Sequence, residues 1–354
     1  MFAFYKLSFK INNHKMNIIL FFLILSLGLI LNYICIKKNF LLNLTGDTHQ
    51  KFTSSENVPL LGGIILILTS FFYINLSNFT FIFFISVIFF IGFLSDIKKV
   101  NSPKLRLFFQ ILTVYTCVHF SSIIVTPTNI LLLDYLLGNI SFQIAFTMFC
   151  ILVVINGYNF IDGVNTSLVG YCLIISSSLY YLHLNGIQVS QILDLHSLIY
   201  VLAAIFILNF FNKLYLGDGG SYLLGLLFAI YLIDTYQVND SMSSLFVISL
   251  LWYPAYENLF SILRKVKFSI SPINPDTNHL HQLIFFYLRE IFGRNNFYVN
   301  TFSGLLINLY NLLGILLATK FYNNSQILIL IIIFNLFFYT FVYIKLKNKN
   351  SKSI

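Results

Sequence analysis

Long runs of apolar residues follow one another along this chain, with short polar segments between them. Eleven runs approach the roughly 20 residues that a helix needs to cross a bilayer. Because bilayer hydrocarbon offers no hydrogen-bond partner to an open backbone, we expect each run to be helical. The runs are 16–36, 58–76, 79–94, 105–126, 142–158, 166–184, 195–211, 221–236, 242–263, 302–321 and 326–344. The pattern predicts an all-α integral membrane protein, a polytopic bundle of about eleven transmembrane helices.

Composition supports a single membrane domain over residues 1–354. Hydrophobic residues make up 58% of the chain, charged residues make up 9%, and the mean hydropathy is +0.84, which excludes a water-soluble globular domain. The first run is too long for a signal peptide and lacks a small-residue cleavage site, so we expect it to remain as an anchor. All four cysteines fall inside apolar runs without metal-type spacing, and we interpret them as core residues.

The positions of Lys and Arg predict the orientation of the bundle. Short cytoplasmic loops carry an excess of positive charge, and most of the 21 basic residues fall on one side when the gaps between runs are numbered alternately. We expect that side to be cytoplasmic. Lys6, Lys10 and Lys15 lie on the other side, which leaves open whether translation begins at Met1 or Met16. Topology therefore explains the net charge of +9, and no nucleic-acid partner is needed.

Polar motifs gather at the predicted cytoplasmic helix ends, where most of the twelve carboxylates also lie. Five stretches stand out: 45–52 with 58–63, 92–106, 156–165, 213–225 and 274–281. The largest cytoplasmic segment is expected at residues 264–300. This distribution predicts an active site at the cytoplasmic face of the bundle.

The stretch LGDGGS places Asp218 before two glycines and a serine, at the expected start of a helix. Backbone N–H groups and the helix dipole favour anions there, so the N–H of Gly219 is a candidate phosphate contact. The Asp218 carboxylate is a candidate ligand for Mg²⁺, which takes few protein ligands when a diphosphate supplies the rest. The alternative is a loop in which Asp218 is an N-cap and the glycines serve the turn.

The stretch NGYNFIDG carries Asn156, Asn159 and Asp162 at a spacing of three, which puts them along one face of a helix. Amide and carboxylate groups there can bind a uracil or sugar edge, or complete a metal shell. The alternative is interhelical hydrogen bonding, which is common in membrane bundles.

Two further stretches hold candidate residues. In NPDTNHLH, His279 and His281 follow a proline, so we expect them in a loop or a first helical turn, where imidazoles can contact a diphosphate or act as acid and base. A solvated loop is the alternative. In SDIKKVNSPKLR, the basic residues fit any loop near anionic lipid, and Asp96 is the informative residue.

Together, these stretches resemble the polyprenyl-phosphate N-acetylhexosamine-1-phosphate transferase family, integral membrane enzymes that move a sugar 1-phosphate from a UDP-sugar onto undecaprenyl phosphate. The motifs follow the family's order from about Asp47 to Leu283: QKF with VP..GG, GF..D.....SPKLR, N..NFIDG, LGDGGS..LG and PD..HLH. The bacterial branch that makes lipid-linked precursors of O-antigen, capsule or related surface glycans is the most similar.

The resemblance implies a role for each matching residue. The implied catalytic residues are Asp96, Asp162 and His279, the implied substrate contacts are Lys51, Asn156, Asn159, Gly219 and His281, and the implied metal ligands are Asp218, Asn156 and Asn159. Asp96 matches the second member of the family's Asp-Asp pair, whose proposed role is to bind or deprotonate the lipid phosphate.

The chain departs from the family at Ser95, Asn165 and Leu60, where many relatives carry Asp, Asp and Arg. Ser95 argues against a mechanism that needs two adjacent carboxylates, or a covalent intermediate on the first, so Asp96 is expected to act alone. The lipid phosphate, with a pKa near about 6, is already mostly dianionic at pH 7 and needs little help from a base.

The resemblance also implies the cofactor, partners and location. The cofactor is Mg²⁺, with Mn²⁺ as the alternative ion, and the partners are undecaprenyl phosphate in the bilayer and a UDP-sugar. The location is the bacterial inner membrane, and a homodimer is left open. Two other classes stay open: a catalytically inactive relative serving as a scaffold, and a secondary transporter. A transporter places ionisable residues near the bilayer midplane, commonly in repeated halves, whereas these carboxylates lie at helix ends and no repeat is visible.

Overall fold

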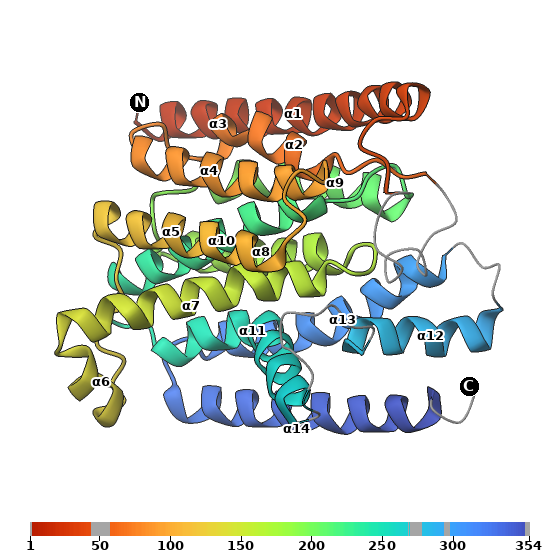
Figure 1. Cartoon of the computed structure of the whole chain (residues 1–354). Helices are drawn as coiled ribbons and strands as arrows, with labels where there is room; N and C mark the ends of the chain where they lie inside the picture. The colour runs from red at the N-terminus through yellow and green to blue at the C-terminus, as the bar shows by residue number, and fades with distance from the viewer. Residues whose placement is uncertain (1, 44–56, 268, 270–277, 294–297, 351–354) are drawn as a thin grey trace.

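The computed structural model describes residues 2–43, 57–267, 269, 278–293 and 298–350. All regular elements in these residues are helices (Figure 1). They are α1 (Phe2–Lys38), α2 (Gly62–Leu68), α3 (Ser70–Tyr73), α4 (Phe79–Asp96), α5 (Pro103–Ser121), α6 (Leu131–Leu137), α7 (Ile140–Ile161), α8 (Ser167–Leu184), α9 (Leu195–Phe210), α10 (Gly217–Gln237), α11 (Ser244–Lys267), α12 (Leu280–Phe292), α13 (Val299–Lys320) and α14 (Ser325–Asn350). The predicted all-α class is confirmed.

Eight helices in the described part of the chain are long and apolar enough to cross a bilayer: α1 from Lys15 onward, α4, α7, α8, α10, α11, α13 and α14. This is the pattern of a multi-pass membrane protein. The predicted number of about eleven spans is not confirmed. The run at 58–76 divides at Thr69 into α2 and α3, α5 begins with the charged Lys104 and Arg106, and α9 has only 16 residues.

Helix α10 lies at the centre of the bundle and packs against α2, α4, α7 and α11. In the most apolar part of α10, 89% of the residues are buried, whereas the corresponding share is 22% in α1 and in α14. A helix with apolar residues on every face is stable only when neighbouring helices or lipid cover all of its faces. The difference therefore identifies α10 as the central helix, and α1 and α14 lie at opposite edges of the bundle (Figure 1).

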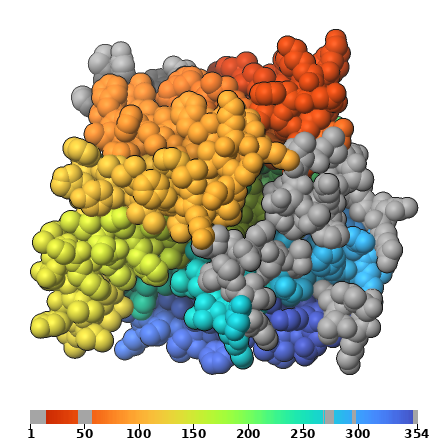
Figure 2. Space-filling model, viewed as in Figure 1, coloured from red at the N-terminus to blue at the C-terminus, as the bar shows by residue number. Residues whose placement is uncertain are grey.

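Large apolar side chains stay exposed on the peripheral helices, as expected of surfaces that face lipid rather than water. Phe22 on α1 is 62% exposed and Phe337 on α14 is 73% exposed. On the face shown in Figure 2, the helices follow one another from the N-terminal edge to the C-terminal edge in approximately chain order.

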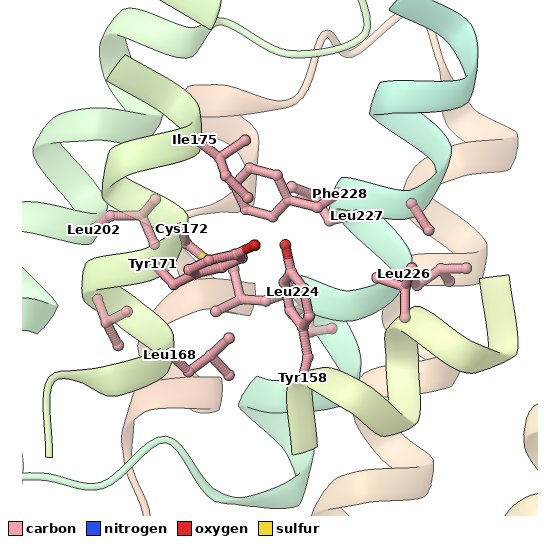
Figure 3. Close-up of a cluster of buried hydrophobic side chains, with 14 of the residues drawn as sticks. Tyr158, Leu168, Tyr171, Cys172, Ile175, Leu202, Leu224, Leu226, Leu227 and Phe228 are labelled. Atoms are coloured by element: carbon pink, nitrogen blue, oxygen red, sulfur yellow. The ribbon is translucent and has the colours of Figure 1, made fainter. Parts of the chain in front are cut away.

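A buried core with several aromatic side chains fills the space between α7, α8 and α10. Tyr158, Tyr171 and Phe228 face the space between them (Figure 3), and the rings of Tyr158 and Tyr171 meet edge to face at 6.4 Å between centroids. Cys172 lies in the same core, and Cys35 and Cys117 are also buried, which confirms the expected core role for these three cysteines; Cys150 is only partly buried. Tyr158 of α7 thus packs against Tyr171 of α8 and Phe228 of α10, which joins the three helices through aromatic contacts.

Candidate active site

Three helix ends that are distant in sequence meet at one point: the C-terminal ends of α4 and α7 and the N-terminal end of α10. They carry Asp96, Asn159 and Asp218 respectively. Hydrogen bonds between side chains of one helix and groups of another join all three ends. The structure thus brings together residues that the sequence stretches placed in one site.

Asp96 caps the start of α10. Its Oδ1 accepts a hydrogen bond of 2.8 Å from the N–H of Asp218, and its Oδ2 accepts one of 3.0 Å from the N–H of Gly219. A carboxylate at a helix N-terminus is stabilised by unpaired N–H groups and by the helix dipole. Gly217 makes this approach feasible, because its φ is +73° and a Cβ there would lie 2.6 Å from Oδ2 of Asp96. The N–H of Gly219, a candidate phosphate contact, is thus directed at Asp96.

Asp218 is held by three side chains. Ser95 donates to its Oδ2 at 2.7 Å, Arg106 pairs with the same oxygen at 2.5 Å, and Asn159 donates to Oδ1 at 2.8 Å. Arg106 also donates to the Ser95 hydroxyl at 2.8 Å. The Asp218 carboxylate is therefore oriented from both sides, and its charge is balanced by the guanidinium.

Arg106 is one of the basic residues of SDIKKVNSPKLR, for which the sequence indicates only proximity to anionic lipid. Pro103 begins α5 directly after the N-cap Ser102, so Arg106 lies in the first turn of that helix and reaches Asp218. The capping sequence Ser-Pro ahead of an arginine could have indicated a fixed side chain rather than a solvated one.

Asp162 directly follows the last residue of α7 and is half buried. Burial raises the pKa of its carboxyl group well above the usual range, and the negative charges of Asp218 and Asp96 raise it further. The three carboxylates thus lie close enough for their charges to affect one another.

Asn156 lies one turn before Asn159 on α7, and its hydrogen bonds go to residues outside the carboxylate cluster. Its amide donates to Gln110 on α5 at 3.1 Å and to the carbonyl of Leu152 at 2.9 Å. It thus supports the contact between α5 and α7 rather than the carboxylate cluster, and its predicted roles toward metal and substrate stay predictions.

Asn165, which stands where many relatives carry Asp, is turned into the protein interior. It is 2% exposed and donates to Asn212 and to Thr301. A charged Asp at this position would be buried without a cation among these contacts, so the neutral amide suits its surroundings.

The two histidines lie beside the end of α7. His279 packs its ring against Phe160 at 5.0 Å between centroids, and His281 lies parallel to His279 at 5.6 Å. A side chain at Gly163 would collide with the His281 ring. The histidine stretch and the NGYNFIDG stretch therefore form adjoining parts of one region. Lys51 lies outside the described residues.

The donor set of the carboxylate cluster suits Mg²⁺. Hard oxygens predominate, and a divalent cation would relieve the repulsion that raises the pKa of Asp162. Among the residues that the structure describes, no group of three or more His, Cys, Asp or Glu side chains is arranged as a complete metal site. Asp218 and Asn159 would hold such an ion, and substrate oxygens and water would have to complete its shell.

Residues 79–236 match the family model described as Glycosyl transferase family 4. This segment runs from the start of α4 almost to the end of α10 and contains Asp96, Asp162 and Asp218. His279 and His281 lie beyond it.

The chain is also similar to two curated proteins named undecaprenyl-phosphate alpha-N-acetylglucosaminyl 1-phosphate transferase. It is 26% identical to the Yersinia pestis protein over 178 residues, which is 48% of this chain and 47% of that protein. It is 27% identical to the Escherichia coli K12 protein over 148 residues, which is 39% of each. The chain thus matches less than half the length of these relatives.

The fold and the carboxylate cluster define a multi-pass membrane protein with a partly buried polar site where three helix ends meet. The family model and the named relatives support the family predicted from the motifs: the segment that builds this site, residues 79–236, matches Glycosyl transferase family 4.

Proposed function

We propose that this chain transfers a sugar 1-phosphate, of the N-acetylhexosamine type, from a UDP-sugar to undecaprenyl phosphate and releases UMP. The observation that carries the proposal is the meeting of Asp96, Asn159 and Asp218 at three helix ends within the segment that matches the family. The names of the relatives supply the substrates. The product would start a lipid-linked surface glycan.

The reaction is a phosphoryl transfer. An oxygen of the lipid phosphate attacks the β-phosphorus of the UDP-sugar, the bond from that phosphorus to the oxygen bridging the two phosphates breaks, and UMP leaves with the bonding electrons. Such reactions depend on positioning and on neutralising charge. A Mg²⁺ ion bound at the cluster would supply charge neutralisation at the diphosphate.

The residues of the chain would supply the positioning. Asp96 fixes the start of α10, Asn159 and Ser95 orient the Asp218 carboxylate, and Arg106 offers a guanidinium beside it. A guanidinium has more donors than one carboxylate can use, so Arg106 can also bind a phosphate oxygen of the substrate.

The proposal places the site at the cytoplasmic face of a bacterial inner membrane. Lys37 and Lys38 end α1 on the side that the charge pattern predicts to be cytoplasmic, and Arg264, Lys265 and Lys267 end α11 on the same side. UDP-sugars are water-soluble. They can therefore reach a site at a helix end from the aqueous phase more easily than a site at the bilayer midplane.

The test is release of UMP by the purified full chain in proteoliposomes that contain undecaprenyl phosphate and Mg²⁺. With UDP-N-acetylglucosamine, we expect release that depends on the lipid phosphate, and competing UDP-sugars would identify the preferred sugar. A well-folded chain that releases UMP from none of the UDP-sugars would support the inactive scaffold instead.

Ser95→Ala is expected to reduce turnover by less than about 10-fold, because one neutral hydrogen bond contributes about 1 kcal/mol and Arg106 still pairs with Asp218. Ser86→Ala is the matched control, since Ser86 also lies on α4 but donates to the Ile82 carbonyl of its own helix. A loss of more than about 100-fold in Ser95→Ala alone would show that the hydroxyl itself is needed in the reaction.

His279→Ala is expected to lower turnover by about 10²-fold, the effect of losing one preorganised contact to a developing phosphate charge. The control is His183→Ala, which removes an exposed imidazole from the last turn of α8. Steady-state UMP release measures both variants. The structure buries both histidines instead of leaving them in a solvated loop, so wild-type kinetics in His279→Ala would mean that this imidazole has only a packing role.

A further inference from the structure

A carboxylate is buried against the histidine stretch. Glu257 on α11 is 1% exposed; its Oε1 lies 2.9 Å from Nδ1 of His279, and its Oε2 accepts a hydrogen bond of 2.6 Å from the Tyr339 hydroxyl on α14. Burying an ionised carboxylate costs several kcal/mol unless partners compensate it. Ionisable residues inside membrane-spanning helices are rare and mark functional sites. Glu257 therefore calls for a functional explanation.

The hydrogen bonds fix both the ring and the backbone of His279. A carboxylate beside Nδ1 favours a proton on that nitrogen and turns Nε2 to the opposite edge of the ring. The His279 N–H donates to Gln282 at 3.1 Å, and Arg264 donates to the carbonyl of Asn278 at 2.5 Å. The imidazole is thus held directly from α11, its backbone is fixed by Gln282 on α12, and α14 acts only through the Glu257 carboxylate.

Both histidine rings lie beside the end of α7 that carries the proposed active site. The ring of His279 lies against Phe160 near the end of α7, and the parallel ring of His281 lies against Gly163. Both positions flank Asp162. Burial and the nearby His279 lower the pKa of His281 to about 3, so His281 is neutral at pH 7.

We propose that Glu257 and Tyr339 are positioning residues that hold His279, with its Nδ1 protonated, for contact with the substrate diphosphate. Tyr339 acts through Glu257, since it touches the carboxylate oxygen that faces away from the histidine. This inference rests on the proposed transferase activity.

Tyr339→Phe tests the inference with the smallest change, since it removes one hydroxyl and keeps the ring. We expect kcat to fall about 10-fold, as for other groups that orient a functional histidine, while KM for the UDP-sugar stays within about 2-fold, because the contact strengthens as charge develops. The matched control is Tyr253→Phe. Tyr253 is also 1% exposed and lies on the helix of Glu257, but its hydroxyl has no hydrogen-bond partner among the described residues. Equal effects of the two variants would overturn the inference.

Glu257→Gln should lower kcat by about 10- to 100-fold, and Glu257→Asp should restore part of it, because the carboxylate returns on a shorter side chain. In the His279→Ala background, Tyr339→Phe should have no further effect on kcat. A full additional loss there would mean that Tyr339 acts on the fold and not through His279.

Nitrogen-15 resonances of labelled histidines in the detergent-solubilised chain give a readout that does not depend on activity. The signal missing in His279→Ala identifies that residue, and we expect a protonated Nδ1 in the wild type and a changed signal in Tyr339→Phe. An unprotonated Nδ1 would overturn the inference. An inactive wild type with a protonated Nδ1 would instead contradict the proposed transfer while leaving the histidine geometry intact.

Discussion

Asp218→Asn is expected to lower turnover by about 10³-fold or more while the protein stays folded. The substitution keeps the size of the side chain but removes the charge that pairs with Arg106 and that would hold the metal ion. Losing several kcal/mol of charge stabilisation corresponds to about three powers of ten in rate. Steady-state UMP release measures the effect, and Mg²⁺-dependent nucleotide binding should be lost with it.

Asp234→Asn is the matched control for that variant. Asp234 lies at the other end of α10, where it accepts a hydrogen bond from Ser190. The control should keep near wild-type turnover. If Asp218→Asn turned over normally at saturating Mg²⁺, neither the metal role nor the carboxylate cluster would explain the activity.

Asp96→Asn is expected to lower turnover by about 10³-fold. Hydrogen bonds to a charged acceptor contribute about 1.5–3 kcal/mol each, and Asp96 accepts two of them from the start of α10. An amide has only one acceptor, so its NH₂ would face an N–H and displace the backbone that carries Asp218. UMP release and the melting temperature are measured together.

Asp194→Asn separates helix capping in general from the site. Asp194 caps α9 and accepts from the N–H of His196, so its loss should cost about 1 kcal/mol of stability without affecting turnover. Equal loss of activity in Asp96→Asn and Asp194→Asn would show that the effect at Asp96 is merely one of stability.

The helical class could be predicted from sequence because the bilayer forces apolar runs to satisfy their own backbone. The number of spans could not, because local bonding decides where a run breaks. At Thr69 the side-chain hydroxyl donates to the Ile65 carbonyl, and the Tyr73 hydroxyl donates to Leu66 in the same run, where α2 gives way to α3. Composition alone does not show that division.

The sequence identified residues of the site but could not predict the hydrogen bonds that each of them makes. The three-residue spacing put Asn156 and Asn159 on one face, yet only Asn159 lies level with Asp218, and Asn156 reaches Gln110 instead. Such differences depend on which neighbouring helix each side chain faces. The spacing of residues within one helix carries no information about its neighbours.

Glu257 shows the same limit more strongly. Glu257 is not among the candidate residues that the motifs identify, and its partners His279 and Tyr339 lie 22 and 82 positions further along the chain. No spacing rule links positions so far apart. Only the packing of α11, α12 and α14 brings them together.

The fate of the β-phosphate tests the central claim most directly. UDP-N-acetylglucosamine labelled with ³²P at the β-phosphate is incubated with the full chain, undecaprenyl phosphate and Mg²⁺ in proteoliposomes, and the lipid and nucleotide products are separated. We predict that the label moves into the lipid fraction in equal amount to unlabelled UMP. Label that stays in released UDP, with the sugar alone on the lipid, would contradict sugar 1-phosphate transfer.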